Sequence, residues 1–190
     1  MAQRVKGNKK AIKRETKKLI TPVKIGTDHI RGSIDAPISI VEYGDYECPY
    51  TGMAYPIVKE IMKKFNNRFY FVFRNFPLND IHPNAQHSAE AAEAAAAQDK
   101  FWEMHDYLFE HQKALDDSHL LQYAERLGLD TNKFKNEMSG HTYAPLIKES
   151  LKTGIDSGVQ GTPTFFVNGN RYEDSWDLET FSNFLKTLNT

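Results

Sequence analysis

The chain has 190 residues, of which 40% are hydrophobic and 26% charged, and its net charge is −1. This composition is typical of one globular domain, or of one domain with an insertion. No apolar run reaches the roughly 20 residues of a membrane-spanning helix, no apolar secretion signal is present, and the single cysteine disfavours structural disulfides, so we expect a cytoplasmic protein.

The basic charge is concentrated at the N-terminus. Residues 1–24 contain nine Lys or Arg residues and one acidic residue, Glu15, which leaves the rest of the chain with a net charge of −9. A basic stretch of this kind is compatible with nucleic acid or an anionic surface. It has no interleaved aromatic residues and no nucleic-acid-binding motif. We therefore predict a flexible arm over residues 1–24 and no nucleic-acid partner.

After the N-terminal arm, the sequence predicts a strand, a helix and a second strand. Residues 29–32 predict a short edge strand, and residues 38–43 a buried strand. A helix with Pro56 inside it is expected from Pro49 to about residue 66. Its apolar face is made by Met53, Ile57, Val58, Ile61, Met62 and Phe65. The aromatic run 69–73 predicts a central strand, parallel to the first and reached by a right-handed crossover.

Five helical patterns follow, and they predict an all-helical insertion. Ser118 is the expected N-cap of the third helix. The expected apolar face of the fifth is formed by Tyr143, Leu146, Ile147, Leu151 and Ile155. A strand pattern returns at residues 164–167, and Asn168-Gly169 predicts a hairpin turn. Asp177 is expected to cap a last helix.

The only cysteine, Cys48, lies between the predicted strand 38–43 and the helix that begins at Pro49. The first turn of a helix has unpaired N–H groups and a partial positive charge, which favour a thiolate over a thiol. Proline suits the first helical position because its missing N–H is not needed there. The context favours a reactive cysteine; the alternative is a buried cysteine that acts as a small hydrophobic residue.

Several motifs resemble those of the DsbA-like branch of the thioredoxin superfamily, in particular of the thioredoxin-like domains related to those fused to Na⁺/H⁺ antiporters. Glu47-Cys48-Pro49-Tyr50 matches the start of the ECPYC motif of that group. The other matching stretches are Phe76-Pro77-Leu78, His82-Pro83-Asn84-Ala85, Phe101-Trp102-Glu103-Met104-His105 and Gly161-Thr162-Pro163-Thr164-Phe165. The resemblance covers about residues 22–188.

The resemblance implies an α/β protein with a thioredoxin fold and a helical insertion. The thioredoxin-like parts are then expected at residues 25–82 and 158–190, and the helical insertion at 83–157.

The resemblance also implies the site. Cys48 is the expected nucleophile, with Pro49 and Tyr50 beside it. Pro163 is the expected cis-proline next to the sulfur, and Thr162 is expected to present its backbone to an extended substrate. From the sequence alone, Pro163 is equally compatible with an ordinary proline at the first residue of a strand.

Thr51 departs from the family pattern, which has a second, resolving cysteine at this position. The hydroxyl of Thr51 cannot attack a mixed disulfide, but it is expected to donate a hydrogen bond to the Cys48 thiolate. A protein that passes its own disulfide to a client is therefore excluded. Three mechanisms stay open: exchange resolved by an external thiol such as glutathione, oxidation of Cys48 in a redox sensor or weak peroxidase, and redox-inactive binding of peptides or partners.

Other candidate residues are weaker. His82 is a candidate neighbour of Cys48, and Glu47 a carboxylate that tunes the thiolate or is simply solvated. The histidines lack the spacing of common zinc motifs, so we expect no metal, and no cofactor beyond glutathione as a co-substrate. The expected partners are thiols and disulfides of proteins or peptides. We expect a monomer, with a covalent Cys48–Cys48 dimer as the alternative.

Overall fold

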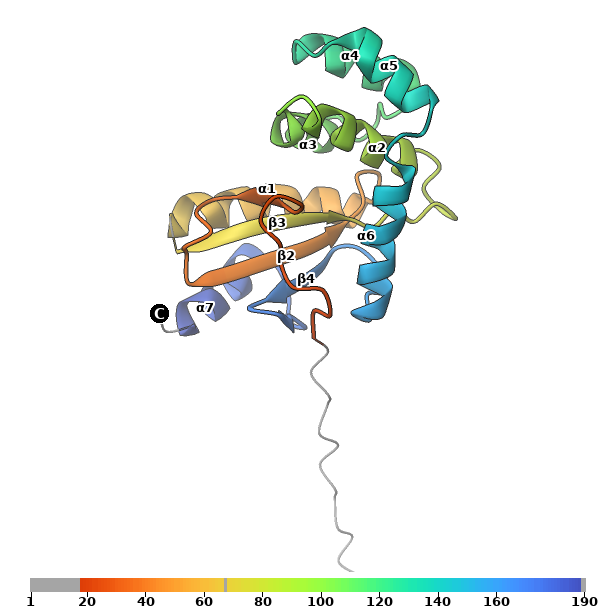
Figure 1. The fold of residues 1–190 in the computed structure, drawn as a ribbon. Coiled ribbons are helices and arrows are strands. Elements are labelled where there is room, and N and C mark those ends of the chain that lie inside the picture. The colour runs from red at the N-terminus through yellow and green to blue at the C-terminus, as the bar shows by residue number, and fades with distance from the viewer. Residues whose placement is uncertain (1–17, 67, 189–190) are drawn as a thin grey trace, which may run out of the picture.

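A mixed five-stranded sheet forms the centre of the molecule, and helices pack on both of its faces (Figure 1). This computed structural model describes residues 18–66 and 68–188. The order across the sheet is β1-β3-β2-β4-β5. The strands are β1 (His29–Arg31), β2 (Ile38–Gly44), β3 (Phe69–Asn75), β4 (Thr164–Val167) and β5 (Asn170–Arg171).

The predicted strand–helix–strand unit is present. β2 and β3 run parallel, in a register from Ile38 opposite Phe69 to Gly44 opposite Asn75, and α1 (Pro49–Phe65) connects them. β4 pairs antiparallel with β2 on its other side. The turn between β4 and β5 has positive φ at both Asn168 (47°) and Gly169 (75°), the backbone of a tight type I′ hairpin. This confirms the turn predicted from the Asn-Gly pair.

Alternation along β2 assigns its side chains to the two faces of the sheet. Ile40 belongs to the core that α1 and α7 (Leu178–Thr187) cover, whereas Val41 and Tyr43 belong to the opposite core. Because successive side chains of a strand point to opposite faces, Glu42 lies on the side of α1. The strand thus carries an acidic residue into the apolar layer beneath the helix that Cys48 begins.

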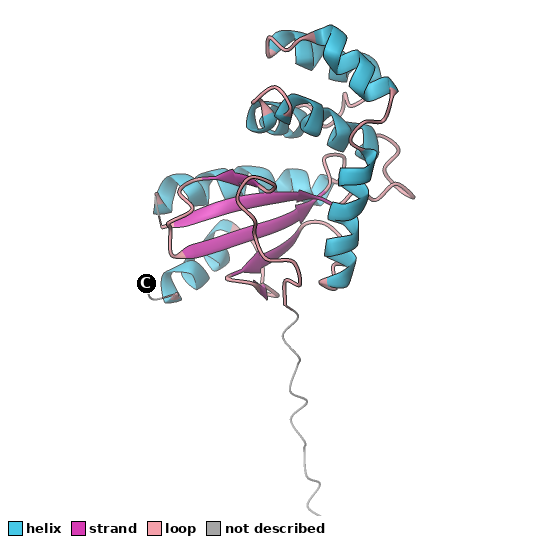
Figure 2. Ribbon diagram, viewed as in Figure 1, coloured by secondary structure: helices cyan, strands magenta, loops and turns pink. Residues whose placement is uncertain are grey.

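Five helices lie between β3 and β4, and Figure 2 shows most of them grouped beyond one side of the sheet. They are α2 (Ala85–Ala96), α3 (Phe101–Glu110), α4 (Asp117–Arg126), α5 (Thr131–Ser139) and α6 (Ala144–Asp156). α2 is central because it contacts each of the other four. Four of its alanines, Ala91, Ala92, Ala94 and Ala95, are completely buried. Small side chains let several helices approach this one closely.

Two details of the inserted helices differ from the prediction. Asp116, not Ser118, is the N-cap of α4, because its carboxylate accepts the N–H groups of Ser118 and His119. Leu146 and Ile155 of α6 are about half exposed. α6 approaches the sheet through Gly154, where an added Cβ would lie 2.6 Å from the ring of Phe76, so its buried face is narrower than the apolar pattern indicates.

Part of the predicted arm, residues 18–24, lies within the described residues. Residues 1–17 lie outside the described residues. Lys18 bridges to Asn170, Leu19 N donates to Gly169 O at 2.9 Å, and Ile20 N donates to the Ser157 hydroxyl at 3.1 Å. Residues 18–20 are therefore tied to the β4–β5 hairpin and to the end of α6, in contrast to the flexible arm expected there.

Candidate active site

Cys48 is the N-cap residue of α1, at the point where the chain leaves β2. Its side chain is only 3% exposed and makes no capping hydrogen bond to the first turn of the described helix. Instead, Sγ donates to the backbone carbonyl of Thr162 at 3.3 Å. The Thr162–Pro163 peptide bond is cis. The fold thus brings Cys48 together with Thr162 and Pro163, which follow it by more than 110 residues in the sequence.

The other residues of the motif take different environments. Pro49 occupies the first turn of α1, as expected, and Tyr50 is 62% exposed. Thr51 is buried, but its Oγ1 accepts the backbone N–H of Asp45 at 3.5 Å. Among the described residues, no hydrogen bond joins Thr51 to the sulfur of Cys48, in contrast to our expectation. Met53, expected in the buried face of α1, is 59% exposed and lies one helical turn beyond Tyr50.

Asp45 organises the loop before Cys48. Its carboxylate is fully buried and accepts the backbone N–H groups of Glu47 at 2.8 Å and Leu78 at 2.9 Å. His82 Nδ1 completes the set at 2.8 Å. Because a buried carboxylate requires partners for its lone pairs, this network fixes the loop and brings His82 next to it. His82 therefore reaches the cysteine loop through Asp45, a residue that the sequence analysis did not select.

Glu47 does not project into solvent. Its carboxylate accepts the backbone N–H of Asn84 at 2.6 Å and the side-chain amide of Asn84 at 2.8 Å. Asn84 is the N-cap residue of α2. The negative charge of Glu47 thus lies at the positive end of α2, where it is favourable, and links the cysteine loop to the helical insertion.

Gln112, in the connection between α3 and α4, holds the other side of the cysteine loop. Its Nε2 donates to the carbonyls of Tyr46 at 2.8 Å and Cys48 at 3.0 Å. Gly52 permits this approach, since a Cβ at that position would lie 1.9 Å from Gln112 Oε1. Sequence analysis missed Gln112 because nothing in its neighbourhood in the chain indicates a contact with residues more than 60 positions away.

A buried acid lies beneath α1. Glu42 is 3% exposed, its Oε1 has no hydrogen-bond partner among the described residues, and burial raises its pKa to about 8. Glu42 shares a small cavity of about 10 Å³ with Tyr55 and His105. Burial lowers the pKa of His105 well below its usual value, and its Nδ1 bonds to the Tyr46 hydroxyl at 3.2 Å. Sequence analysis did not select Glu42, although a charged residue within the apolar run 38–43 could have indicated a buried acid.

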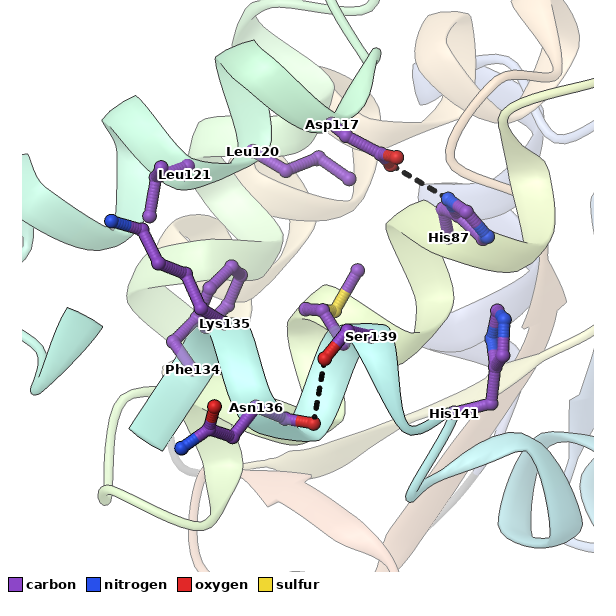
Figure 3. A pocket seen from close by; sticks show the side chains of 10 residues that line it. His87, Asp117, Leu120, Leu121, Phe134, Lys135, Asn136, Ser139 and His141 are labelled. Carbon is purple, nitrogen blue, oxygen red and sulfur yellow. Dashed lines mark hydrogen bonds and ion pairs between the residues drawn. The ribbon is translucent and has the colours of Figure 1, made fainter. Parts of the chain in front are cut away.

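A further cavity lies among the inserted helices. It has a volume of about 490 Å³ and is lined by residues of α2, α4 and α5 and of the turn that follows α5. Leu120 and Phe134 are buried residues of its lining, and Figure 3 shows the His87–Asp117 pair at one side of it. None of the residues around Cys48 lines this cavity, so it is separate from the candidate site.

Comparison with known proteins shows the family to which this chain belongs. Residues 24–187 match the family model described as thioredoxin. The chain belongs to the thioredoxin family. Membership of this family supports a function of the thiol–disulfide oxidoreductase type.

Solved structures of the thioredoxin type share the whole fold. Oxidised BdbD from Bacillus subtilis is 22% identical, covers 90% of this chain and 96% of its own, and gives a TM-score of 0.78. α-DsbA1 from Wolbachia pipientis is 19% identical, with coverages of 90% and 94% and a TM-score of 0.77. These likenesses confirm the DsbA-like thioredoxin fold with helices inserted between β3 and β4.

The curated relatives are longer proteins. A protein named Na⁺/H⁺ antiporter NhaA 1 from Salinispora arenicola is 49% identical over 164 residues, which are 86% of this chain and 25% of that protein. An NhaA protein from Herminiimonas arsenicoxydans is 37% identical over 165 residues, or 87% and 26%. This chain therefore spans about a quarter of the length of these relatives, and it aligns with them over its thioredoxin-like region.

Two further observations concern residues 18–66 and 68–188. No helix in these ranges has both the length and the apolar character needed to cross a membrane. No group of three or more His, Cys, Asp or Glu side chains in these ranges is arranged to hold a metal ion.

Proposed function

We propose that this protein catalyses thiol–disulfide exchange through Cys48 alone. The observation that carries the proposal is the position of the sulfur, which lies at the N-terminus of α1 and 3.3 Å from the Thr162 carbonyl. A helix N-terminus presents unpaired N–H groups and a partial positive charge, and the thiolate is the form of a cysteine that attacks disulfides. The neighbouring carbonyl offers a hydrogen-bond acceptor to an extended substrate backbone.

The exchange has two steps. The Cys48 thiol loses its proton to solvent, and the thiolate attacks one sulfur of a protein or glutathione disulfide. The new Sγ–S bond forms as the old S–S bond breaks, and the other sulfur leaves as a thiolate. Thr51 cannot resolve this mixed disulfide, so an external thiol such as glutathione attacks it, restores Cys48 and forms a new disulfide with the substrate sulfur.

The test compares the folded and unfolded states of one protein. Reduced protein is mixed with glutathione disulfide, and intact-mass spectrometry follows the appearance of one bound glutathione. Native Cys48 is expected to react faster than Cys48 in urea-unfolded protein, and added glutathione is expected to remove the adduct. The Cys48→Ser protein provides the blank. Slower reaction in the native state than in urea would exclude catalysis of exchange.

A second function is favoured by the exposure pattern. Cys48 is 3% exposed, whereas Tyr50 and Met53, within the next two turns of α1, are 62% and 59% exposed. A sheltered sulfur beside exposed apolar side chains suits a module that binds apolar peptides without redox chemistry. In that case Cys48→Ser would bind such peptides as tightly as the natural protein, and Met53→Lys would not.

A further inference from the structure

Two histidines meet at the edge of the cavity of about 490 Å³ in the helical insertion. His87 lies in the first turn of α2, and His141 lies in the turn between α5 and α6. Their ring centroids are 5.4 Å apart, and the ring planes are inclined by 46°. Figure 3 shows both side chains at the same side of the cavity, with the imidazole of His141 directed toward that of His87.

A carboxylate holds each of these histidines through Nδ1. His87 Nδ1 lies 2.6 Å from Asp117 Oδ1 at the start of α4, and His141 Nδ1 lies 3.3 Å from Glu90 Oε2 on α2. Because an ionised carboxylate only accepts hydrogen bonds, the Nδ1 that faces it carries the proton. In the neutral imidazole, the lone pair is then on Nε2. Within residues 18–66 and 68–188, neither Nε2 makes a hydrogen bond, so both lone pairs are available to a ligand.

Metal-binding histidines adopt this arrangement. Such a histidine donates its second ring N–H to a carboxylate or a carbonyl, which fixes the tautomer and the orientation of the ring. The separation of the two rings also fits a shared ion. A tetrahedral zinc ion, bound by two Nε2 atoms at about 2.0–2.1 Å and in line with each ring, would place the ring centroids about 5.2 Å apart. The observed separation of 5.4 Å is close to this value.

The charges around the two rings favour a cation. Glu90 is 1% exposed, and its side-chain partners among the described residues are His141 and the amide of Gln86. Buried charges in proteins are normally paired or coordinate a metal. Asp117 adds a second carboxylate. Lys135 is the one Lys or Arg residue in the lining of the cavity, and Figure 3 shows its ammonium group at the side opposite the histidines.

We propose that His87 and His141 bind a zinc ion through their Nε2 atoms. Asp117 and Glu90 orient the imidazoles from behind, and water fills the remaining positions of the ion. Because the carboxylates are engaged by Nδ1, the site has two protein ligands rather than three or four. The ion joins α2 to the turn after α5. Our expectation of no metal rested on the short spacings of common zinc motifs, whereas these histidines come from separate segments of the chain.

The test is a calorimetric titration of the full chain with zinc chloride near neutral pH. The chain carries Cys48→Ser, because a thiolate is itself a zinc ligand. The expected result is saturable binding of one ion per chain, with shifts of the imidazole nitrogen signals of His87 and His141 in NMR spectra. Magnesium chloride is the comparison, since magnesium prefers oxygen ligands. Absence of saturation by about 1 mM zinc, or equal binding of magnesium, overturns the proposal.

Three variants locate the ion. His87→Gln and His141→Gln each keep an N–H donor for the partner carboxylate but lose the imidazole, and each should weaken zinc binding about tenfold or more. Asp117→Asn changes an exposed residue and should weaken binding about tenfold, the effect of removing a group that orients a ligand. His119→Gln is the matched control, because His119 forms a similar exposed pair with Asp116, and it should leave the affinity unchanged. Unchanged affinity in both His87→Gln and His141→Gln, or an equal loss in His119→Gln, overturns the proposal.

Discussion

The buried carboxyl of Glu42 should make the protein less stable as the pH rises. Its pKa is about 8 in the folded protein against 4.5 as the reference value, because burial disfavours the charged form. Between these two values the folded state keeps a proton that the unfolded state has lost. Stability therefore falls with rising pH across this window, and the full penalty is reached only above the folded pKa.

The size of the effect follows from the shift. Each pH unit in the window costs about 1.36 kcal/mol, so that raising the pH from 4.5 to 7 costs about 3 kcal/mol. Glu42→Gln keeps the shape of the side chain and cannot ionise. We expect its free energy of unfolding to match that of the natural protein near pH 4.5 and to exceed it by about 3 kcal/mol at pH 7.

The assay is urea unfolding followed by circular dichroism at pH 5, 6, 7 and 8. Other titrating groups, such as His105, are present in both proteins and largely cancel in the difference. Glu60→Gln on the exposed side of α1 is the control, and it should follow the natural protein at every pH. Parallel pH profiles for the natural protein and Glu42→Gln would show that Glu42 is already ionised in the folded state and would refute the argument.

Three further predictions concern the cysteine loop. Gln112→Ala removes two hydrogen bonds and should lower the free energy of unfolding by about 2 kcal/mol, measured by urea unfolding. Gly52→Ala displaces the same side chain. The double variant should therefore lose less free energy of unfolding than the sum of the losses in the two single variants. Asp45→Asn replaces one carboxylate oxygen with an NH2 group, which would face N–H groups that need an acceptor. It should lower the free energy of unfolding by about 3 kcal/mol in the same measurement. Thr51→Cys should form an intramolecular disulfide with Cys48, visible in the intact mass, because residues one helical turn apart have Cα atoms about 5 Å apart.

Matched controls separate these effects from general damage. Gln122→Ala and Asp35→Asn change exposed residues of the same types and should alter stability by less than about 0.5 kcal/mol. Additive costs for Gly52→Ala and Gln112→Ala would contradict the shared contact. A Thr51→Cys protein that stays a dithiol under mild oxidation would show that the sulfur of Cys48 points away from position 51.

Local patterns in the sequence determined much of the fold. Asn168-Gly169 specifies its hairpin because the turn needs positive φ at both positions, and Asp177 caps α7 because its carboxylate can reach the free N–H groups of its own helix. Cys48-Pro49 marks a helix start for the same local reason. These signals depend on neighbours in the chain, so they can be interpreted without the tertiary structure.

Only the tertiary structure decided what surrounds the sulfur. Thr162 and Gln112 reach Cys48 from distant parts of the chain, and their contacts are made by backbone carbonyls or by an amide side chain that has no sequence signature. Likewise, the helical period of α6 predicted an apolar face but could not predict how much of that face the sheet would cover. In the structure Leu146 is about half exposed and lines a cavity of about 290 Å³. Periodicity encodes which side of an element is apolar; packing decides which residues on that side meet a partner.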